Sequence, residues 1–201
     1  MKRMFLMSCL ILFLATLLWA QEKIETPPEW KVGDRWVYQN QDGRRVTNRV
    51  IRLEEVDGIP HYVVQRGVNE IYFTKDIRHH LTKRAPESGK VIVKWEPPLP
   101  LFSWPLEVGK KWKEKLKLHQ FTPATAGRWI VDLESKVVRI EEVEVPAGKF
   151  KAFHIYTTET VEQVVDFHRW YSLKVGYVIW EKGYSMGEPY ELKLLEYHRG
   201  E

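Results

Sequence analysis

Short runs of alternating apolar and polar residues, separated by turn residues, cover most of the chain. Trp112, Leu116 and Leu118 alternate with lysines, which is the period-two pattern of a half-buried strand. Asp-Gly pairs at 42–43 and 57–58 are hairpin signals between such runs. No segment has the period of an amphipathic helix. The pattern predicts an all-β protein, an antiparallel meander twisted into a curved sheet or half-open barrel.

One stretch of sequence occurs nearly twice. Arg49-Val-Ile-Arg-Leu-Glu-Glu-Val56 returns as Lys136-Val-Val-Arg-Ile-Glu-Glu-Val143. Two shorter pairs keep the same order along the chain: residues 32–36 with 108–112, and residues 72–77 with 170–175. These matches predict an internal repeat, with two structurally related halves, and one continuous meander is the alternative.

A proline-rich segment at 97–105 marks the boundary between the predicted halves, 21–96 and 106–201. Prolines occupy positions 97, 98, 100 and 105. Because proline has no backbone N–H, we expect this segment to connect the halves without a regular hydrogen-bond ladder. A polyproline recognition segment is the functional alternative.

Residues 1–20 have the pattern of a secretory signal peptide. Two basic residues precede an apolar run that ends at Ala20, so cleavage would leave Gln21 first. The run is shorter than the roughly 20 residues of a spanning helix, although an uncleaved anchor is the alternative. Cys9, the only cysteine, lies inside this segment, which excludes a disulfide in the mature chain. We expect a periplasmic or extracellular protein.

Net charge is too small to indicate nucleic-acid binding. The chain carries 31 basic and 27 acidic residues, a net charge of +4, which falls to +2 without Lys2 and Arg3. Lys113, Lys115 and Lys117 share one face of a predicted strand. This lysine row is interpreted as a solvated edge, with weak contact to an anionic membrane surface as the alternative.

No combination of residues indicates catalysis or a cofactor. Serines lie in no nucleophile elbow, no Gly-rich loop precedes a helix, and neighbouring acids on a strand point to opposite faces. His154 and His168 can face each other across a hairpin near Asp166, but two histidines do not make a zinc site. We therefore predict no catalytic residue, no metal and no cofactor.

Aromatic residues beside proline, glycine or charged residues are the remaining candidates for a site. They can line a groove for an apolar or glycan ligand, and packing in the core is the alternative. The predicted ligand-binding residues are Trp95, Phe102, Trp104, Trp129 and Trp180. The hypothesis is a non-catalytic envelope protein that binds an apolar, lipid-like ligand or a protein partner in a curved-sheet cleft, and the alternative is an envelope-polymer hydrolase.

Two motifs carry a resemblance to known proteins. Val145-Pro-Ala-Gly-Lys-Phe150 and Trp170-Tyr-Ser-Leu-Lys-Val-Gly176 resemble a broad group of exported bacterial proteins of unknown function. Lys149 and Leu173 depart from the usual Thr and Pro of that group. The resemblance implies a β-rich half-open barrel or curved sheet similar to periplasmic lipoprotein carriers, and it implies no reaction.

Overall fold

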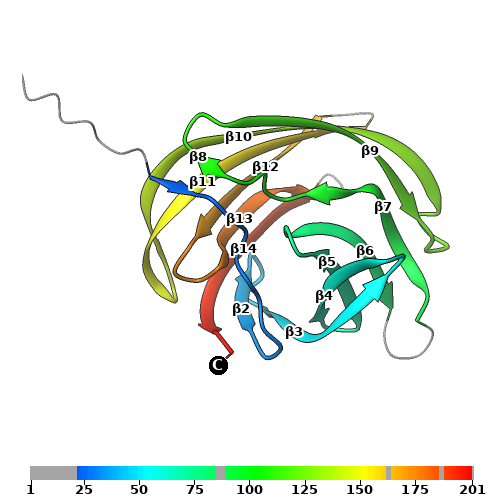
Figure 1. Ribbon diagram of the computed structural model, residues 1–201, viewed down its shortest axis with the longest axis horizontal. Helices are drawn as coiled ribbons and strands as arrows, with labels where there is room; N and C mark the ends of the chain where they lie inside the picture. The colour runs from blue at the N-terminus through cyan, green and yellow to red at the C-terminus, as the bar shows by residue number, and fades with distance from the viewer. Residues whose placement is uncertain (1–21, 85–88, 162–163, 186–187, 201) are drawn as a thin grey trace, which may run out of the picture.

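Fourteen strands and no helix make up the part of the chain that the computed structural model describes, residues 22–84, 89–161, 164–185 and 188–200 (Figure 1). The predicted signal peptide lies outside these residues. Within them, no helix long and apolar enough to cross a membrane is found. The all-β, antiparallel prediction is confirmed.

Twelve strands close into one antiparallel barrel in the order β10-β11-β12-β13-β14-β2-β3-β4-β5-β6-β7-β9. A separate two-stranded ladder joins β1 to β8. The strands are β1 (Lys23–Ile24), β2 (Arg35–Asn40), β3 (Arg45–Val56), β4 (Ile59–Arg66), β5 (Asn69–Thr74), β6 (Arg78–Arg84), β7 (Val91–Pro100), β8 (Leu106–Glu107), β9 (Lys111–Gln120), β10 (Gly127–Val145), β11 (Gly148–Thr160), β12 (Val164–Ser172), β13 (Tyr177–Ser185) and β14 (Glu188–His198).

The barrel is closed, where the sequence predicts an antiparallel curved sheet or half-open barrel. The chain's two six-strand runs, β2–β7 and β9–β14, meet along two seams, β14 with β2 and β7 with β9. At the second seam Val93 lies opposite Gln120 and Glu96 opposite Lys117. The two seams close the barrel, although β7 after Glu96 and β9 before Lys117 each have a neighbour on one side only. Closure thus shortens the unpaired edges that promote sheet aggregation.

The two six-strand runs begin with the same turn. The Gly33 amide donates to the Val50 carbonyl (2.8 Å), and the Gly109 amide donates to the Val137 carbonyl (2.9 Å). Both glycines have positive φ, 101° and 90°, which side chains disfavour. The halves thus share strand order and this turn, while a duplicated sequence stays a prediction.

The core fills the barrel with apolar side chains from the inner face of each strand. Trp36 is fully buried, and its Nε1 donates to the Val175 carbonyl (3.3 Å). Trp30 packs against it with ring centroids 4.9 Å apart. On β9 Leu116 is fully buried while Lys115 and Lys117 are exposed, as the alternation predicts.

The proline-rich segment is partly a strand, contrary to expectation. Strand β7 continues to Pro100, and Pro100 pairs with Arg78 on β6. Pairing with β9 stops at Glu96, so the prolines lie where β7 has a neighbour on one side only. An edge position tolerates a residue without an N–H, which explains the difference.

Candidate functional site

A row of side chains crosses five strands on the face of the sheet opposite the core. Direct cross-strand pairing joins each residue to the next. The row runs from β10 to β14 as Arg139, His154, Trp170, Trp180 and Lys193. The neighbouring residue Ile155 points the other way and is fully buried, which places the row on the outer face.

The rings in this row stand face to face. His154 and Trp170 have centroids 4.5 Å apart and planes 5° apart, and Trp170 and Trp180 have centroids 4.1 Å apart. These separations are close to the roughly 4.8 Å between neighbouring strands, so each ring fills the space above its own strand. Nε1 of Trp170 donates to Glu141 (2.7 Å) and Nε1 of Trp180 to Glu191 (2.8 Å). The stack is therefore fixed at both indole nitrogens.

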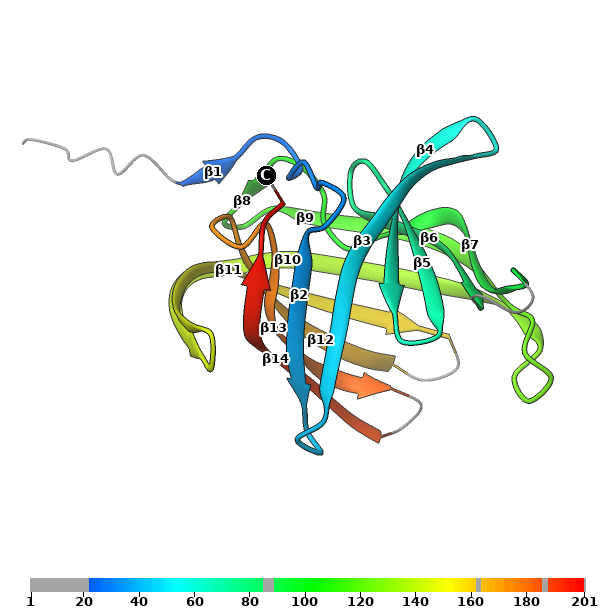
Figure 2. The same cartoon turned by 90° about the horizontal axis from the view of Figure 1, so that it is seen from below.

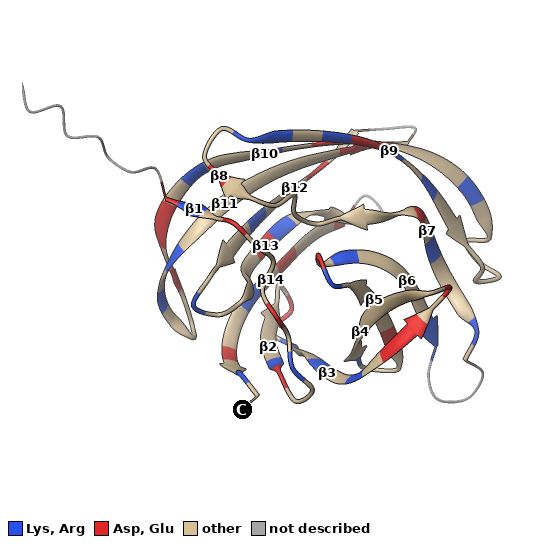
Figure 3. Ribbon diagram, viewed as in Figure 1, with Lys and Arg blue, Asp and Glu red and all other residues tan. Residues whose placement is uncertain are grey.

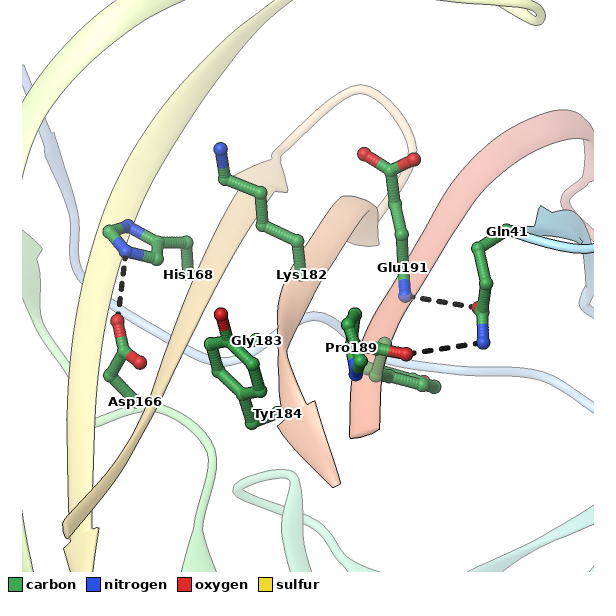
Figure 4. A pocket seen from close by; sticks show the side chains of 9 residues that line it. Gln41, Asp166, His168, Lys182, Gly183, Tyr184, Pro189 and Glu191 are labelled. Atoms are coloured by element: carbon green, nitrogen blue, oxygen red, sulfur yellow. Dashed lines mark hydrogen bonds and ion pairs between the residues drawn. The ribbon is translucent and has the colours of Figure 1, made fainter. Parts of the chain in front are cut away.

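The next row along these strands borders a hollow. Tyr156, His168, Lys182 and Glu191 pair in sequence across β11 to β14. Beside them lies a hollow of about 440 Å³ (Figure 4). Its lining combines charged and amide side chains with tyrosine rings and a proline: Gln41, Asp166, His168, Lys182, Gly183, Tyr184, Pro189, Tyr190 and Glu191. This volume is at the lower end of the range for ligand pockets, about 300–1,000 Å³.

The side chain of Gln41 joins a distant turn to this hollow. Its Nε2 donates to the Pro189 carbonyl (3.3 Å), and its Oε1 accepts from the Glu191 amide (3.2 Å). Gln41 lies between β2 and β3, so the barrel seam between β14 and β2 brings it to the site. Tyr184 at the rim is 50% exposed, which leaves a ring face open to solvent.

Two histidines connect the ring stack to the hollow. Nε2 of His154 lies 2.9 Å from Nδ1 of His168, and Nε2 of His168 lies 3.4 Å from Asp166. Burial lowers the pKa of His154 to about 4, with Arg139 and His168 contributing in the same direction. In the described residues no group of three or more His, Cys, Asp or Glu is placed to hold a metal ion.

The charged side chains around the hollow differ in their contacts: Glu191 is hydrogen-bonded and ion-paired, and Lys182 lies over aromatic rings. Glu191 accepts from Trp180 and lies 3.1 Å from Lys193, so both of its oxygens are occupied. The Lys182 ammonium lies over the rings of Trp170 and Trp180, 5.7 and 5.1 Å from their centroids. Chemically, the arrangement offers an ammonium, an imidazole, an amide and an aromatic face to a ligand. Among the described residues that line the hollow there is no serine, threonine or cysteine.

The five aromatic residues predicted to bind ligand do not form one groove. Phe102 is buried and Trp104 half-buried, and both pack on Tyr171, with centroids 5.0 and 5.6 Å from it. Trp95 is 7% exposed and lies opposite Leu118. These three residues pack as part of the core or against it, the alternative stated above.

The other two predicted residues lie apart from those three. Trp129 is half-buried on β10, where it also pairs with Leu118, and it lines a different hollow. Trp180 belongs to the ring stack, and its direct neighbours Lys182 and Glu191 reach the 440 Å³ hollow. Trp180 is therefore the predicted residue that lies beside the candidate site.

Sequence reasoning missed most of the residues that line the hollow. It did predict that His154 and His168 face each other near Asp166, because they belong to one hairpin. Lys182 and Glu191 give no signal beyond ordinary strand alternation. Gln41 is about 150 positions from Glu191, so only closure of the barrel reveals it.

Comparison with known proteins gives loose structural likenesses. No family model and no curated protein matches the chain. A predicted lipoprotein of Parabacteroides distasonis shares 12% identity at a TM-score of 0.43, covering 86% of this chain and 97% of its own. A predicted exported protein with a YmcC-like fold from Bacteroides fragilis shares 13% at 0.47, covering 88% and 99%. The hypothetical lipoprotein YmcC of Escherichia coli shares 11% at 0.42, covering 81% and 83%.

Proposed function

We propose that this protein is a non-catalytic envelope protein that binds a glycan in the hollow over β12–β14. The observation that carries the proposal is a hollow that combines polar side chains with tyrosine rings beside the stacked rings of Trp170 and Trp180. Sugar recognition combines hydrogen bonds to hydroxyl groups with an aromatic face, and Lys182, Gln41 and the exposed Tyr184 ring offer both.

An apolar, lipid-like ligand fits this hollow less well. Such a ligand would bury the Lys182 ammonium, and burial of a charged group without a hydrogen-bonded partner is costly. The buried aromatic residues Trp95 and Phe102 are already packed, so no apolar groove competes among the predicted residues. The ligand class proposed is therefore polar, and a protein partner is an outcome of the test.

The hydrolase alternative is supported by one observation, since Asp166 and Glu191 line the same hollow. Both carboxylates are engaged, however, with Asp166 near His168 and Glu191 held by Trp180 and Lys193. Glycoside hydrolysis needs one acid to donate a proton and the other to act as base or nucleophile. These contacts favour binding over reaction.

Export is part of the proposal and rests on residues 1–20 and on the resemblance of the Val145–Phe150 and Trp170–Gly176 motifs to exported bacterial proteins. We expect the mature chain to start at Gln21. Intact-mass measurement of the exported form tests this, and a retained Met1 or a diacylglycerol on Cys9 would contradict it.

Binding is tested by calorimetric titration of the purified protein with soluble cell-wall oligosaccharides. We expect Lys182→Ala and Tyr184→Ala each to weaken binding by roughly tenfold, which corresponds to the loss of about 1.4 kcal/mol. Lys149→Ala, an exposed position on the β10–β11 hairpin, is the matched control. Equal affinity of the control and the two site variants would contradict the assignment of the site. Release of shortened products during incubation would support the hydrolase instead.

A further inference from the structure

The hairpin that joins β9 to β10 exposes apolar side chains. Phe121 is 51% exposed and Ile130 is 50% exposed, and half-buried Trp129 lies next to Ile130 in sequence. Figure 2 shows this hairpin protruding from the barrel at the end away from β1 and β8. Large apolar residues at a protruding end cost free energy in water and indicate a surface that contacts something else.

Strand β7 adds to the same surface. The Phe121 amide donates to the Ile92 carbonyl (3.0 Å), and the Phe121 ring stacks on His119 with centroids 6.3 Å apart. Two adjacent hollows of about 400 and 380 Å³ flank this contact. One is lined by residues around Phe121 and Ile92, and the other by residues around His119 and Ile130.

Cations surround these apolar side chains. We define the tip surface as Phe121, Ile130, Trp129 and the charged residues around them, which are Arg84, Lys94, Glu96, Lys117 and Arg128. Four cations and one carboxylate give these described residues a charge of +3, without counting His119. The carboxylate is itself engaged, because Glu96 lies 3.0 Å from Lys94 and 3.4 Å from His119.

The rest of the lysine row differs from the tip surface. Lys113 forms an ion pair with Glu134, and Lys115 lies 3.4 Å from Asp132. The middle of β9 is therefore neutralised by β10, and the excess of positive charge begins where that pairing reaches Lys117, opposite Ile130. Lys and Arg residues along β7 and β9 at this end are visible in Figure 3.

We propose that the tip surface docks on an anionic lipid bilayer, with Phe121 and Ile130 entering the headgroup region and Arg128 and Lys117 contacting lipid phosphates. Apolar side chains ringed by cations match the two attractions of an interface-binding segment, burial of apolar area and attraction to anionic lipid. Charge complementarity selects the lipid, since a neutral membrane surface would not attract the charge of +3 on the tip surface. This proposal does not rest on glycan binding, which uses β12–β14.

Cosedimentation of the mature protein with vesicles tests the docking. Vesicles of phosphatidylcholine mixed with phosphatidylglycerol should bind the protein, vesicles of phosphatidylcholine alone should bind it at least about tenfold more weakly, and added salt should release it. Phe121→Ser and Arg128→Glu should each reduce binding by about tenfold, a loss set by apolar contact in one case and charge in the other. Val32→Ser and Lys149→Glu, both at exposed positions away from the tip surface, are the matched controls.

Trp129 supplies a second readout. Brominated lipids quench nearby indoles, so vesicles that contain them should quench the fluorescence of the wild type more than that of Trp129→Phe. Equal quenching of the two proteins, binding that ignores lipid charge, or a loss of binding as large in the two controls would overturn the proposal. Because the substituted residues of the tip surface are exposed or half-buried, circular dichroism should show each variant folded.

Discussion

Trp170 and Trp180 stack across β12 and β13 with ring planes 15° apart and centroids 4.1 Å apart. A stacked aromatic pair adds roughly 0.5–1.5 kcal/mol beyond the burial of its surface. Trp170 is 4% exposed while Trp180 is half-buried, so Trp180 covers its neighbour. The pair therefore forms a rigid support beside the hollow.

We expect Trp180→Ala to lower the free energy of unfolding by about 2–3 kcal/mol, somewhat less than for a fully buried tryptophan. Trp180→Phe keeps a ring in the stack and loses the hydrogen bond to Glu191, so its cost should be about 1 kcal/mol. Urea unfolding measures both. Tyr184→Ala at the exposed rim is the control and should stay within about 0.5 kcal/mol. A control as damaging as Trp180→Ala would show that the stack is not what stabilises this face.

Trp36 and Trp112 occupy matching positions after the Gly33 and Gly109 turns, but their burial differs. Trp36 is fully buried with its Nε1 bonded to Val175, whereas Trp112 is half-buried and its Nε1 has no hydrogen-bond partner. Trp36→Ala should cost about 3–5 kcal/mol, and Trp112→Ala should cost less. An internal repeat with the two tryptophans at equivalent positions would instead make each substitution cost about 3–5 kcal/mol, so thermal unfolding of the two variants side by side distinguishes repeat symmetry from burial. Equal losses would favour the sequence-based expectation.

The fold class follows from the sequence because strand alternation is local. For example, Leu116 is buried while its neighbours Lys115 and Lys117 are exposed, as the alternation of apolar and polar residues predicts. Closure of the barrel cannot be predicted from this local pattern. It depends on pairing such as that of Val93 with Gln120, and the sequence around each residue does not indicate its partner. Strand alternation therefore predicts the antiparallel sheet but does not determine whether the sheet closes into a barrel.

In the candidate site too, local sequence predicts some contacts, and others arise only from closure of the barrel. The sequence predicts that His154 and His168 face each other, because both belong to one hairpin, and the structure places them in contact. The position of an aromatic residue beside proline was a poor guide to ligand binding, because Trp104, which precedes Pro105, packs on the buried Tyr171. Gln41 reaches the hollow only through the seam between β14 and β2.

Metal removal should leave the fold unchanged. The described residues contain no group of three or more potential ligands placed to hold a metal ion, and His154 and His168 contact each other without a third ligand. A structural zinc site needs four ligands, and chelation of such a site unfolds the domain. We therefore expect the same melting temperature with and without a strong chelator. A fall of several degrees after chelation, restored by added zinc, would contradict this.

Acidification should destabilise the protein through His154. Its pKa is lowered from 6.5 to about 4 by burial, with Arg139, His168 and Lys182 acting in the same direction and Glu141 opposing them. The unfolded state therefore binds a proton at higher pH than the folded state does. The stability that neutral His154 contributes is complete above about pH 6.5 and is lost as the pH falls towards 4. The loss for one such group is at most about 3 kcal/mol.

Urea unfolding at several pH values between 7 and 4 measures this loss, and the comparison of wild type with His154→Gln isolates it. The variant should lose less stability over that range, because a neutral amide replaces the titrating ring. His79 also has a lowered pKa, about 3 by burial, so some slope should persist in the variant. The pKa of Glu54 is also lowered, so this carboxylate affects stability only below about pH 4.5. Above that pH, the change in stability is expected to come from histidine. His198→Gln, at an exposed position, should keep the wild-type slope, and an unchanged slope in His154→Gln would show that His154 is not buried as a neutral ring.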